Sequence, residues 1–261
     1  MKRVTALVIA LCVLLSVAAL AQTAERETLC QASTINALLD GMYDGSVTYG
    51  ALSERGDFGI GTFNSLDGEM IAFDGNIWQI KADGKAYEVA DTMQTPFAAM
   101  TFFDADITAA VPAGTTFEQL GEIIDDLTPG PNLFYAVRVD GTFEYMKTRS
   151  VPGQQKPYPP LVEVTRNQPE FEFENVTGTI AGFRCPDFVK GINVPGDHLH
   201  FIDQARTGGG HILAFTVKEA TVFIDTTPNF LLLLPENSSE FQQRDLTGGR
   251  EEELHEAEAE N

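Results

Sequence analysis

Hydrophobic and polar residues alternate along most of this chain, which is the pattern of half-buried β-strands. Between residues 57 and 103, short alternating segments are separated by the pairs Asp67-Gly68, Asp74-Gly75 and Asp83-Gly84. Asp-Gly between alternating segments is a strong hairpin signal, because both residues tolerate a positive φ. This region therefore predicts a β-meander, with strands at 57–63, 69–74, 76–82, 85–90 and 96–103.

Two segments have helical periodicity instead. Apolar residues recur at helical spacing after residue 34, where Ser33 or Thr34 can cap the first turn, and glycines between 41 and 45 stop the helix. A second capped, amphipathic segment spans 115–127 and ends before Pro129 and Gly130. The chain is therefore expected to contain few helices.

The second half of the sequence is also rich in strands. Segments 132–139 and 142–150 predict a hairpin around Asp140-Gly141, and five further strands are expected at 170–175, 176–184, 197–202, 211–217 and 220–225. Four prolines in 151–160 indicate a linker. Both halves are therefore expected to form hairpin-rich sheet with few helices: an N-terminal region with strands and helices at 22–150, a linker at 151–160, a β-rich region at 161–238 and an acidic tail at 239–261.

Residues 1–21 have the composition of a secretory signal peptide. Lys2 and Arg3 precede a short apolar run, and the small-x-small sequence Ala19-Leu20-Ala21 offers a cleavage site before Gln22. A retained membrane anchor is the less favoured alternative because the apolar run is short. The mature protein is expected to be exported, either periplasmic or secreted.

The 261-residue chain is strongly acidic, with a formal net charge of −21. Such a surface repels nucleic acids and anionic membranes, so neither is expected as a partner. Outside the signal peptide only Cys30 and Cys185 remain, which makes one disulfide possible in an oxidising compartment. Neither cysteine belongs to a C-x-x-C pair, and a thiolate metal site is not expected.

Three of the four histidines fall within residues 198–211. His198 and His200 lie two apart in an alternating segment, so their side chains point to one face of a strand. A glycine-rich turn follows, and His211 begins the next alternating segment. If the two strands form a hairpin, three imidazoles converge and leave an open coordination position, as in catalytic zinc sites. From spacing alone, zinc is favoured, while copper, manganese and iron remain open.

The residues around these histidines resemble the acetolactate decarboxylase family. The resemblance rests on NVPGDHLHFI and GGHILAF, on VTGTIAGFR before them, and on more distant blocks: STINALLDGMYDG, GDFGIGTFNSLDGEM, MKTRSVPGQQKPYPPL, RDLT and HEAE. The blocks occur in the family order and cover nearly the whole chain from about Leu29 onward. The resemblance implies removal of CO2 from α-acetolactate to give acetoin, with zinc (Zn2+) bound by His198, His200 and His211, in a homodimer. It also implies an α+β fold of two strand-rich domains with mixed β-sheets and few helices, an N-terminal α+β domain at 22–150 and a β-rich metal-binding domain at 161–238.

The resemblance also implies roles for residues far from the histidines. Glu69, after the Asp67-Gly68 turn, matches a glutamate near the metal and becomes the leading proton donor or relay. Thr62 matches a residue that lines the substrate pocket. Arg149 matches an active-site arginine, and a guanidinium can bind the substrate carboxylate through two hydrogen bonds. Charge alone does not separate Arg149 from Lys147, and either Glu69 or Arg149 could deliver the final proton.

The C-terminal tail carries the last implied site residue. In the family a glutamate in a His-x-Ala-Glu setting reaches back toward the metal, which selects Glu258. Glu256 and Glu260 are competitors because the Ala/Glu repeat permits a slipped register. A helix from Arg250 onward could deliver this carboxylate as a lid. Without the resemblance, such an acidic end is typical of a solvated helix.

Cys30 and Cys185 lead to one further prediction, a disulfide. Family members commonly have other residues at both positions, and two cysteines in an exported chain predict a Cys30–Cys185 disulfide.

Two other functional classes remain open on the sequence. A secreted cupin-like metalloenzyme also uses H-x-H on a strand with a later histidine, and Asp203 or Gln204 stands where its usual glutamate lies. A non-enzymatic periplasmic metal-binding or ligand-binding protein would need only the histidines and the acidic surface. The decarboxylase interpretation is preferred because it also accounts for the Glu69 and Arg149 blocks.

Overall fold

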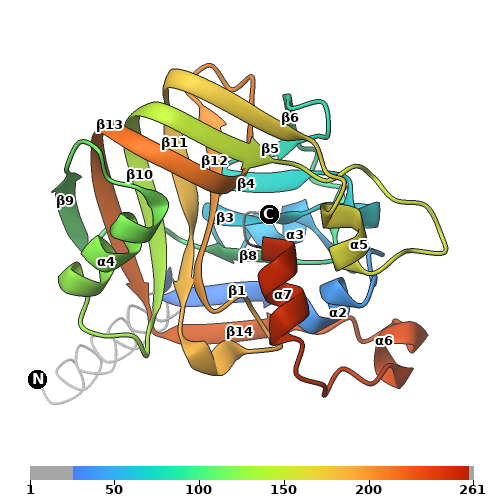
Figure 1. The fold of residues 1–261 in the computed structure, drawn as a ribbon. Helices are drawn as coiled ribbons and strands as arrows, with labels where there is room; N and C mark the ends of the chain where they lie inside the picture. Colours follow the sequence, from blue (N-terminus) through green and yellow to red (C-terminus); the bar gives the residue numbers. More distant parts are fainter. Residues whose placement is uncertain (1–25, 259–261) are drawn as a thin grey trace, which may run out of the picture.

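Two β-sheets pack against each other, and short helices cover their rims and one end (Figure 1). The computed structural model describes residues 26–258. The predicted signal peptide at 1–21 lies outside this range. Among the helices of the described part of the chain, none has the length and apolar character needed to span a bilayer.

The first sheet has seven strands in the order β14-β1-β8-β3-β4-β5-β6. Its strands are β1 (Thr28–Ala32), β3 (Phe58–Thr62), β4 (Glu69–Phe73), β5 (Asn76–Ile80), β6 (Ala86–Glu88), β8 (Ala98–Thr101) and β14 (Asn229–Leu233). β1 and β14 are parallel and the other neighbours antiparallel, so the sheet is mixed. The predicted meander is present from β3 to β6, and β8 joins it on the other side of β3.

The second sheet has five strands in the order β10-β11-β12-β13-β9. They are β9 (Ile107–Val111), β10 (Phe134–Arg149), β11 (Glu170–Cys185), β12 (Gly196–Asp203) and β13 (Gly209–Thr227). β10 also pairs with β13. The strands β10, β11, β12 and β13 therefore close into a barrel-like ring around an apolar interior, and β9 extends the sheet beyond β13.

The described helices are short and sit outside the sheets. They are α2 (Ile35–Leu39), α3 (Tyr49–Ser53), α4 (Phe117–Leu127), α5 (Leu161–Thr165), α6 (Ser239–Gln243) and α7 (Glu251–Glu258), and the pair β2 (Val47–Thr48) and β7 (Gln94–Thr95) forms a small third sheet. Thr34 caps α2 and Thr116 caps α4, at the ends that the sequence indicates. The strand-rich α+β class with mixed sheets and few helices is confirmed.

The predicted hairpin at Asp140-Gly141 is wrong, because β10 runs straight through it. Gly141 does not have a positive φ. Its lack of a side chain instead allows β10 to approach β13, since a Cβ there would clash with the Glu219 carbonyl. The Asp140 carboxylate accepts hydrogen bonds from Thr179 Oγ1 at 2.8 Å and Arg138 Nε at 2.9 Å. An Asp-Gly pair here serves close strand packing.

The sheets interleave along the sequence. β9 and β10 precede residues 151–160 but share a sheet with β11, β12 and β13, which follow them. β14 returns near the end of the chain to pair with β1. The boundary drawn at 151–160 therefore does not coincide with a boundary between the sheets, and this segment connects β10 to α5.

The predicted Cys30–Cys185 disulfide is absent, and both thiols are free and buried. Cys30 faces the side of the seven-stranded sheet that packs on Tyr49 and Leu52 of α3. Cys185 lies in the core between the two sheets, together with Leu29, the neighbour of Cys30. Successive side chains of a strand point to opposite faces, so the sheet itself separates the two sulfur atoms.

A cluster of carboxylates lies where β13 approaches the end of β8. Asp225 is 2% exposed and accepts a hydrogen bond from the Asp104 amide at 3.2 Å. Burial raises the pKa of Asp225 to about 7; the hydrogen bond from the Asp104 amide opposes this shift, and the negative charges of Glu27, Asp106 and Asp104 add to it. The folded protein therefore binds this proton more tightly than the unfolded chain, in which an aspartate has a pKa of about 3.9.

The stabilising contribution of protonated Asp225 should be complete below about pH 4 and lost as the pH rises through about 7. Asp225→Asn removes this titration, so the free energy of unfolding should decline less between pH 5 and pH 8 than in the wild type. Denaturant unfolding at several pH values measures the difference. Asp126→Asn, on the exposed side of α4, is the matched control. Parallel pH profiles for the wild type and Asp225→Asn would contradict the assignment.

Candidate active site and metal centre

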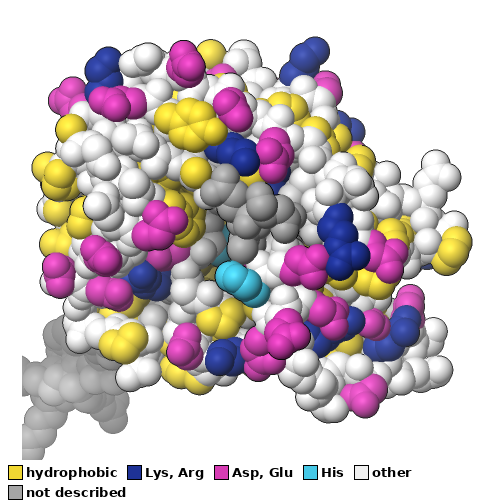
Figure 2. Space-filling view, viewed as in Figure 1, with side chains coloured by type: hydrophobic (Ala, Val, Ile, Leu, Met, Phe, Trp, Pro, Cys, Tyr) yellow, Lys and Arg dark blue, Asp and Glu magenta, His cyan; other side chains and the backbone are white. Residues whose placement is uncertain are grey.

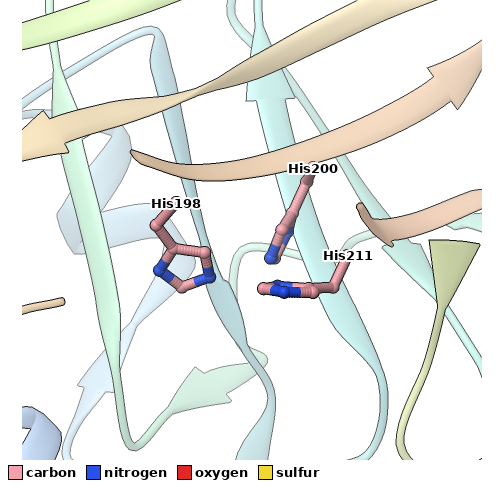
Figure 3. A group of neighbouring side chains, drawn as sticks. All are labelled: His198, His200 and His211. Atoms are coloured by element: carbon pink, nitrogen blue, oxygen red, sulfur yellow. The ribbon is translucent and has the colours of Figure 1, made fainter. Parts of the chain in front are cut away.

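Three histidine side chains converge between the two sheets (Figure 3). His198 and His200 lie on the outer face of β12, whereas Leu199 and Phe201 point into the apolar interior of the closed strands. His211 of β13 pairs directly with His200. One ligand nitrogen from each histidine lies within 4.8 Å of the others. The predicted β12–β13 hairpin and its convergence of imidazoles are therefore present.

The glycines of the connecting turn allow this register. Gly210 has a φ of 138°, which L side chains rarely adopt. A Cβ on Gly209 would clash with the Phe201 carbonyl across the hairpin. These positions let β13 come close enough to β12 for His211 to lie beside His200.

The histidines are suited to bind a cation as neutral ligands. His200 Nδ1 lies 2.7 Å from the Met70 carbonyl, which can only accept, so Nδ1 carries the proton and Nε2 keeps its lone pair. That Nε2 is buried and has no hydrogen-bond partner among the described residues. Burial and the nearby Arg149 lower the pKa of His198 to about 3, and burial holds the pKa of His200 and His211 well below the usual value. The donor set fits a divalent transition metal.

Arg149 is the last residue of β10 and the direct cross-strand partner of His211. Its side chain is 5% exposed; Nη2 donates to the Ala257 carbonyl, and Nη1 is buried with no partner in the described structure. Lys147 instead pairs with Glu170, with its Nζ 3.1 Å from Oε2. The structure thus brings Arg149 to the histidines and leaves Lys147 outside the cavity they line.

Glu69 begins β4 and points into the space between the sheets, like Ile71 two residues later. Its Oε2 lies 3.6 Å from His200 Nε2. Burial raises the pKa of Glu69 to about 8; Arg149 opposes this shift and Glu258 adds to it. Without a bound cation, the Glu69 carboxyl therefore holds its proton at neutral pH.

Thr62, the last residue of β3, lines the same cavity opposite Glu69 in the strand register. Its hydroxyl donates to the Gly68 carbonyl at 2.7 Å, and the hydroxyl oxygen can still accept a hydrogen bond from another group. Tyr49 and Thr95 both donate to the Thr62 carbonyl at 2.7 Å. These hydrogen bonds hold Thr62 in place.

The C-terminal helix α7 places Glu258 beside two of the histidines. Its Oε2 lies 3.6 Å from Nε2 of both His198 and His211, and 3.9 Å from Arg149 Nη2. Burial raises the pKa of Glu258, and Arg149 opposes that shift. Of the competing acids, Glu256 faces outward, with Oε1 2.8 Å from Arg166 Nε, and Glu260 lies beyond the described residues.

Helix α7 is held by apolar packing and by ion pairs at its start. Leu254 and Ala257 are buried in a cluster that includes Ile35 and Leu38 of α2. Arg250, immediately before the helix, has Nη1 3.0 Å from Asp40 Oδ1. Figure 2 shows acidic side chains, interspersed with Lys and Arg, on the face where α7 lies. The tail thus has one buried apolar side and one charged exposed side.

The functional side chains enclose a small cavity of about 40 Å³. The rest of its wall is apolar except for Thr165 and Gln168, and the other members are Ile35, Leu38, Gly61, Leu66, Phe97, Val151, Leu161 and Ala257. Sequence reasoning does not single out these wall residues, because they come from separate segments and each resembles an ordinary core residue.

The position required by a cupin-like interpretation is occupied by a turn. Asp203 ends β12, and its carboxylate accepts hydrogen bonds from the Thr207 amide at 2.8 Å and from Thr207 Oγ1 at 2.6 Å. Neither Asp203 nor Gln204 lines the histidine cavity. The carboxylates near the histidines are Glu69 and Glu258 instead.

Comparison with known proteins places this geometry in a family. A family model described as alpha-acetolactate decarboxylase matches residues 29–248. The alpha-acetolactate decarboxylase of Methylococcus capsulatus is 50% identical over 234 residues, 90% of each chain, and that of Methanosarcina mazei is 48% identical over 232 residues, 89% of this chain and 80% of the relative.

Solved structures agree with the sequence relatives. The crystal structure of alpha-acetolactate decarboxylase from Bacillus subtilis strain 168 is similar with a TM-score of 0.87 and 42% identity, over 89% of this chain and 100% of that chain. A Staphylococcus aureus protein described as similar to alpha-acetolactate decarboxylase has a TM-score of 0.85 and 33% identity, over 88% of this chain and 100% of that chain. The chain belongs to the alpha-acetolactate decarboxylase family.

Proposed function

We propose that this protein removes CO2 from α-acetolactate (2-hydroxy-2-methyl-3-oxobutanoate) to give acetoin, and that zinc bound by His198, His200 and His211 is its cofactor. One observation carries the proposal: three neutral imidazoles, a guanidinium and two carboxyl groups line one small buried cavity. Family membership supports the reaction, and the unpartnered His200 Nε2 supports the metal.

The metal and the arginine have separate tasks in this proposal. A divalent metal held by the three histidines supplies a Lewis acid for the oxygen atoms of the substrate. Arg149 binds the substrate carboxylate through its free Nη1 and orients the bond that breaks. When that carbon–carbon bond breaks, CO2 leaves and the electron pair moves toward the ketone oxygen, which gives an enediolate.

A proton must then reach the carbon that lost CO2. We assign this step to Glu69, because its carboxyl group lies within the cavity beside the proposed metal ligands, with Oε2 3.6 Å from His200 Nε2. Arg149 is the alternative donor, although its guanidinium holds its proton more strongly than a carboxyl group does. Delivery from one side of the cavity gives a single acetoin enantiomer.

Removal and replacement of the metal tests the cofactor. The purified protein should contain about one zinc per chain and lose acetoin formation after treatment with a chelator, and stoichiometric zinc should restore it. Elemental analysis and an acetoin assay on the same samples measure both quantities. Undiminished acetoin formation in metal-free protein would overturn the zinc assignment. Bound zinc without any acetoin formation would favour a metal-binding protein.

The tail is proposed to take part in the reaction. Truncation after Gly249 removes α7 and Glu258, so we expect activity to fall several-fold while the three-histidine site stays loaded with zinc. Glu258→Gln in the full-length chain should also lower activity, whereas Glu256→Gln is the matched control because Glu256 pairs with Arg166 on the surface. Kinetic assays and zinc analysis measure both effects. Full activity after truncation would show that α7 and Glu258 take no part in the reaction.

Export and dimerisation are further parts of the proposal. The basic start, apolar run and small-x-small site of residues 1–21 support cleavage before Gln22 and export. Family membership supports a homodimer. N-terminal sequencing of the mature protein tests the first, and light scattering of the purified protein tests the second.

A further inference from the structure

Gln168 is a polar residue of the cavity wall to which neither the motifs nor the proposed mechanism assigns a role. It lies in the loop between α5 and β11 and lines the cavity together with Arg149 and the three histidines. Its Oε1 is buried and has no hydrogen-bond partner within residues 26–258. A buried acceptor without a partner costs free energy, which a bound donor would recover.

A complementary unpaired donor lies in the same cavity. Arg149 Nη1 is also buried without a partner in the described structure. The adjoining wall includes Val151 and Leu161, which cannot satisfy either group. A ligand that fits this pair needs an acceptor for the guanidinium and an O–H or N–H group for the amide oxygen.

The backbone holds these two residues beside each other. The Ser150 amide donates to the Pro169 carbonyl at 3.2 Å, which links the residue after Arg149 to the residue after Gln168. Arg149 and Glu170 are then the first cross-strand pair of β10 and β11. The backbone N–H of Gln168 also donates to the Thr165 carbonyl at 3.4 Å, and this hydrogen bond fixes the loop to the end of α5. The position of Gln168 next to Arg149 is therefore built into the sheet.

We propose that Gln168 binds the α-hydroxyl group of the substrate, while Arg149 binds its carboxylate. This inference rests on the proposed function, because acetolactate carries both groups on one carbon. Its tertiary hydroxyl is its only hydrogen-bond donor, since the ketone and the carboxylate can only accept. Gln168 then makes the cavity selective for α-hydroxy-β-keto acids over β-keto acids that lack the hydroxyl group.

Two unreactive acids of nearly the same shape test the assignment. In 2,2-dimethylpropanoate a methyl group replaces the hydroxyl group of 2-hydroxy-2-methylpropanoate, and both keep the carboxylate. Calorimetric titration of the zinc-loaded protein gives a dissociation constant for each acid without requiring turnover. The variant is Gln168→Leu, which keeps the size of the side chain but has no acceptor. Asn167→Ala, at the exposed neighbouring position, is the control.

In Gln168→Leu the preference for the hydroxy acid should fall by about threefold to tenfold, the usual range for one neutral hydrogen bond. The affinity for 2,2-dimethylpropanoate and the zinc content should stay at their wild-type values, and the melting temperature of the unliganded protein should not fall. The KM for acetolactate should rise by a similar factor. Asn167→Ala should bind both acids as the wild type does. If Gln168→Leu does not fold, Gln168→Asn, which withdraws the oxygen by one methylene group, should show the same loss.

Two results would overturn the inference. An unchanged preference for the hydroxy acid would show that Gln168 does not bind the hydroxyl group. Equal weakening of both acids would show that the amide donates to the carboxylate instead. Failure of the proposed function is distinguishable, because it appears as a wild-type protein that forms no acetoin, whatever the two dissociation constants are.

Discussion

His200→Ala is expected to abolish both zinc binding and acetoin formation. Its Nε2 is buried and has no hydrogen-bond partner in the part of the chain that the structure describes, and its Nδ1 is held by the Met70 carbonyl, so no other orientation of the ring is favoured. Alanine removes one of three ligands, and the remaining two imidazoles cannot hold the ion in place. Loss of a Lewis acid that contributes several kcal/mol lowers the rate by about a thousandfold or more.

Elemental analysis and acetoin assays on His198→Ala, His200→Ala and His211→Ala measure this effect. His255→Ala is the matched control, because His255 is exposed on α7 and does not line the histidine cavity. It should keep both zinc and activity. A variant with all three site histidines replaced by alanine that still bound one zinc per chain would disprove the metal site.

Arg149→Lys is expected to lower kcat/KM by about a hundredfold or more while zinc content stays unchanged. Lysine keeps the positive charge but lacks the planar fork that binds a carboxylate with two hydrogen bonds. Arg149 also donates to the Ala257 carbonyl, so its guanidinium contributes to the seating of α7. A lysine ammonium group at the end of a flexible chain replaces neither contact well.

Lys147→Arg is the control for this substitution. Lys147 pairs with Glu170 outside the cavity, and arginine can keep that ion pair, so activity should be close to that of the wild type. Steady-state kinetics on zinc-loaded variants compare the two. Near-normal kcat/KM in Arg149→Lys would mean that Arg149 has a structural role only.

Local patterns predicted the local parts of the site. The alternation around His198 and His200 and the glycine turn before His211 predicted the hairpin, because side-chain direction in a strand has a period of two. Turn chemistry also predicted the β4–β5 hairpin, where Asp74 and Gly75 both have positive φ. Such features depend only on neighbours in the sequence.

Long-range packing explains the predictions that were wrong. Gly141 has the same dipeptide context as a turn glycine, and only the approach of β13 shows why it lies mid-strand. The Cys30–Cys185 disulfide fails because a whole sheet separates the two thiols, which cysteine counting cannot show. Neither the approach of β13 to Gly141 nor the sheet between the two thiols can be inferred from the residues next to them in the sequence.

The distant site residues fall between these cases. Glu69, Arg149 and Glu258 were selected by the family resemblance. From the sequence pattern alone, each is equally compatible with an ordinary exposed charged residue. The structure brings all three within 4 Å of another site residue. Gln168 escaped notice because a polar residue in a short loop carries no local sign of burial; its unpartnered oxygen becomes visible only in three dimensions.

The most direct test of the account is the reaction itself. Purified protein loaded with zinc is mixed with racemic acetolactate, and acetoin and CO2 are followed against the spontaneous rate in the same buffer. We predict equal amounts of acetoin and CO2, a single acetoin enantiomer, and a return to the spontaneous rate when a chelator is present. Folded, zinc-loaded protein that forms acetoin no faster than the buffer alone would contradict the proposed function.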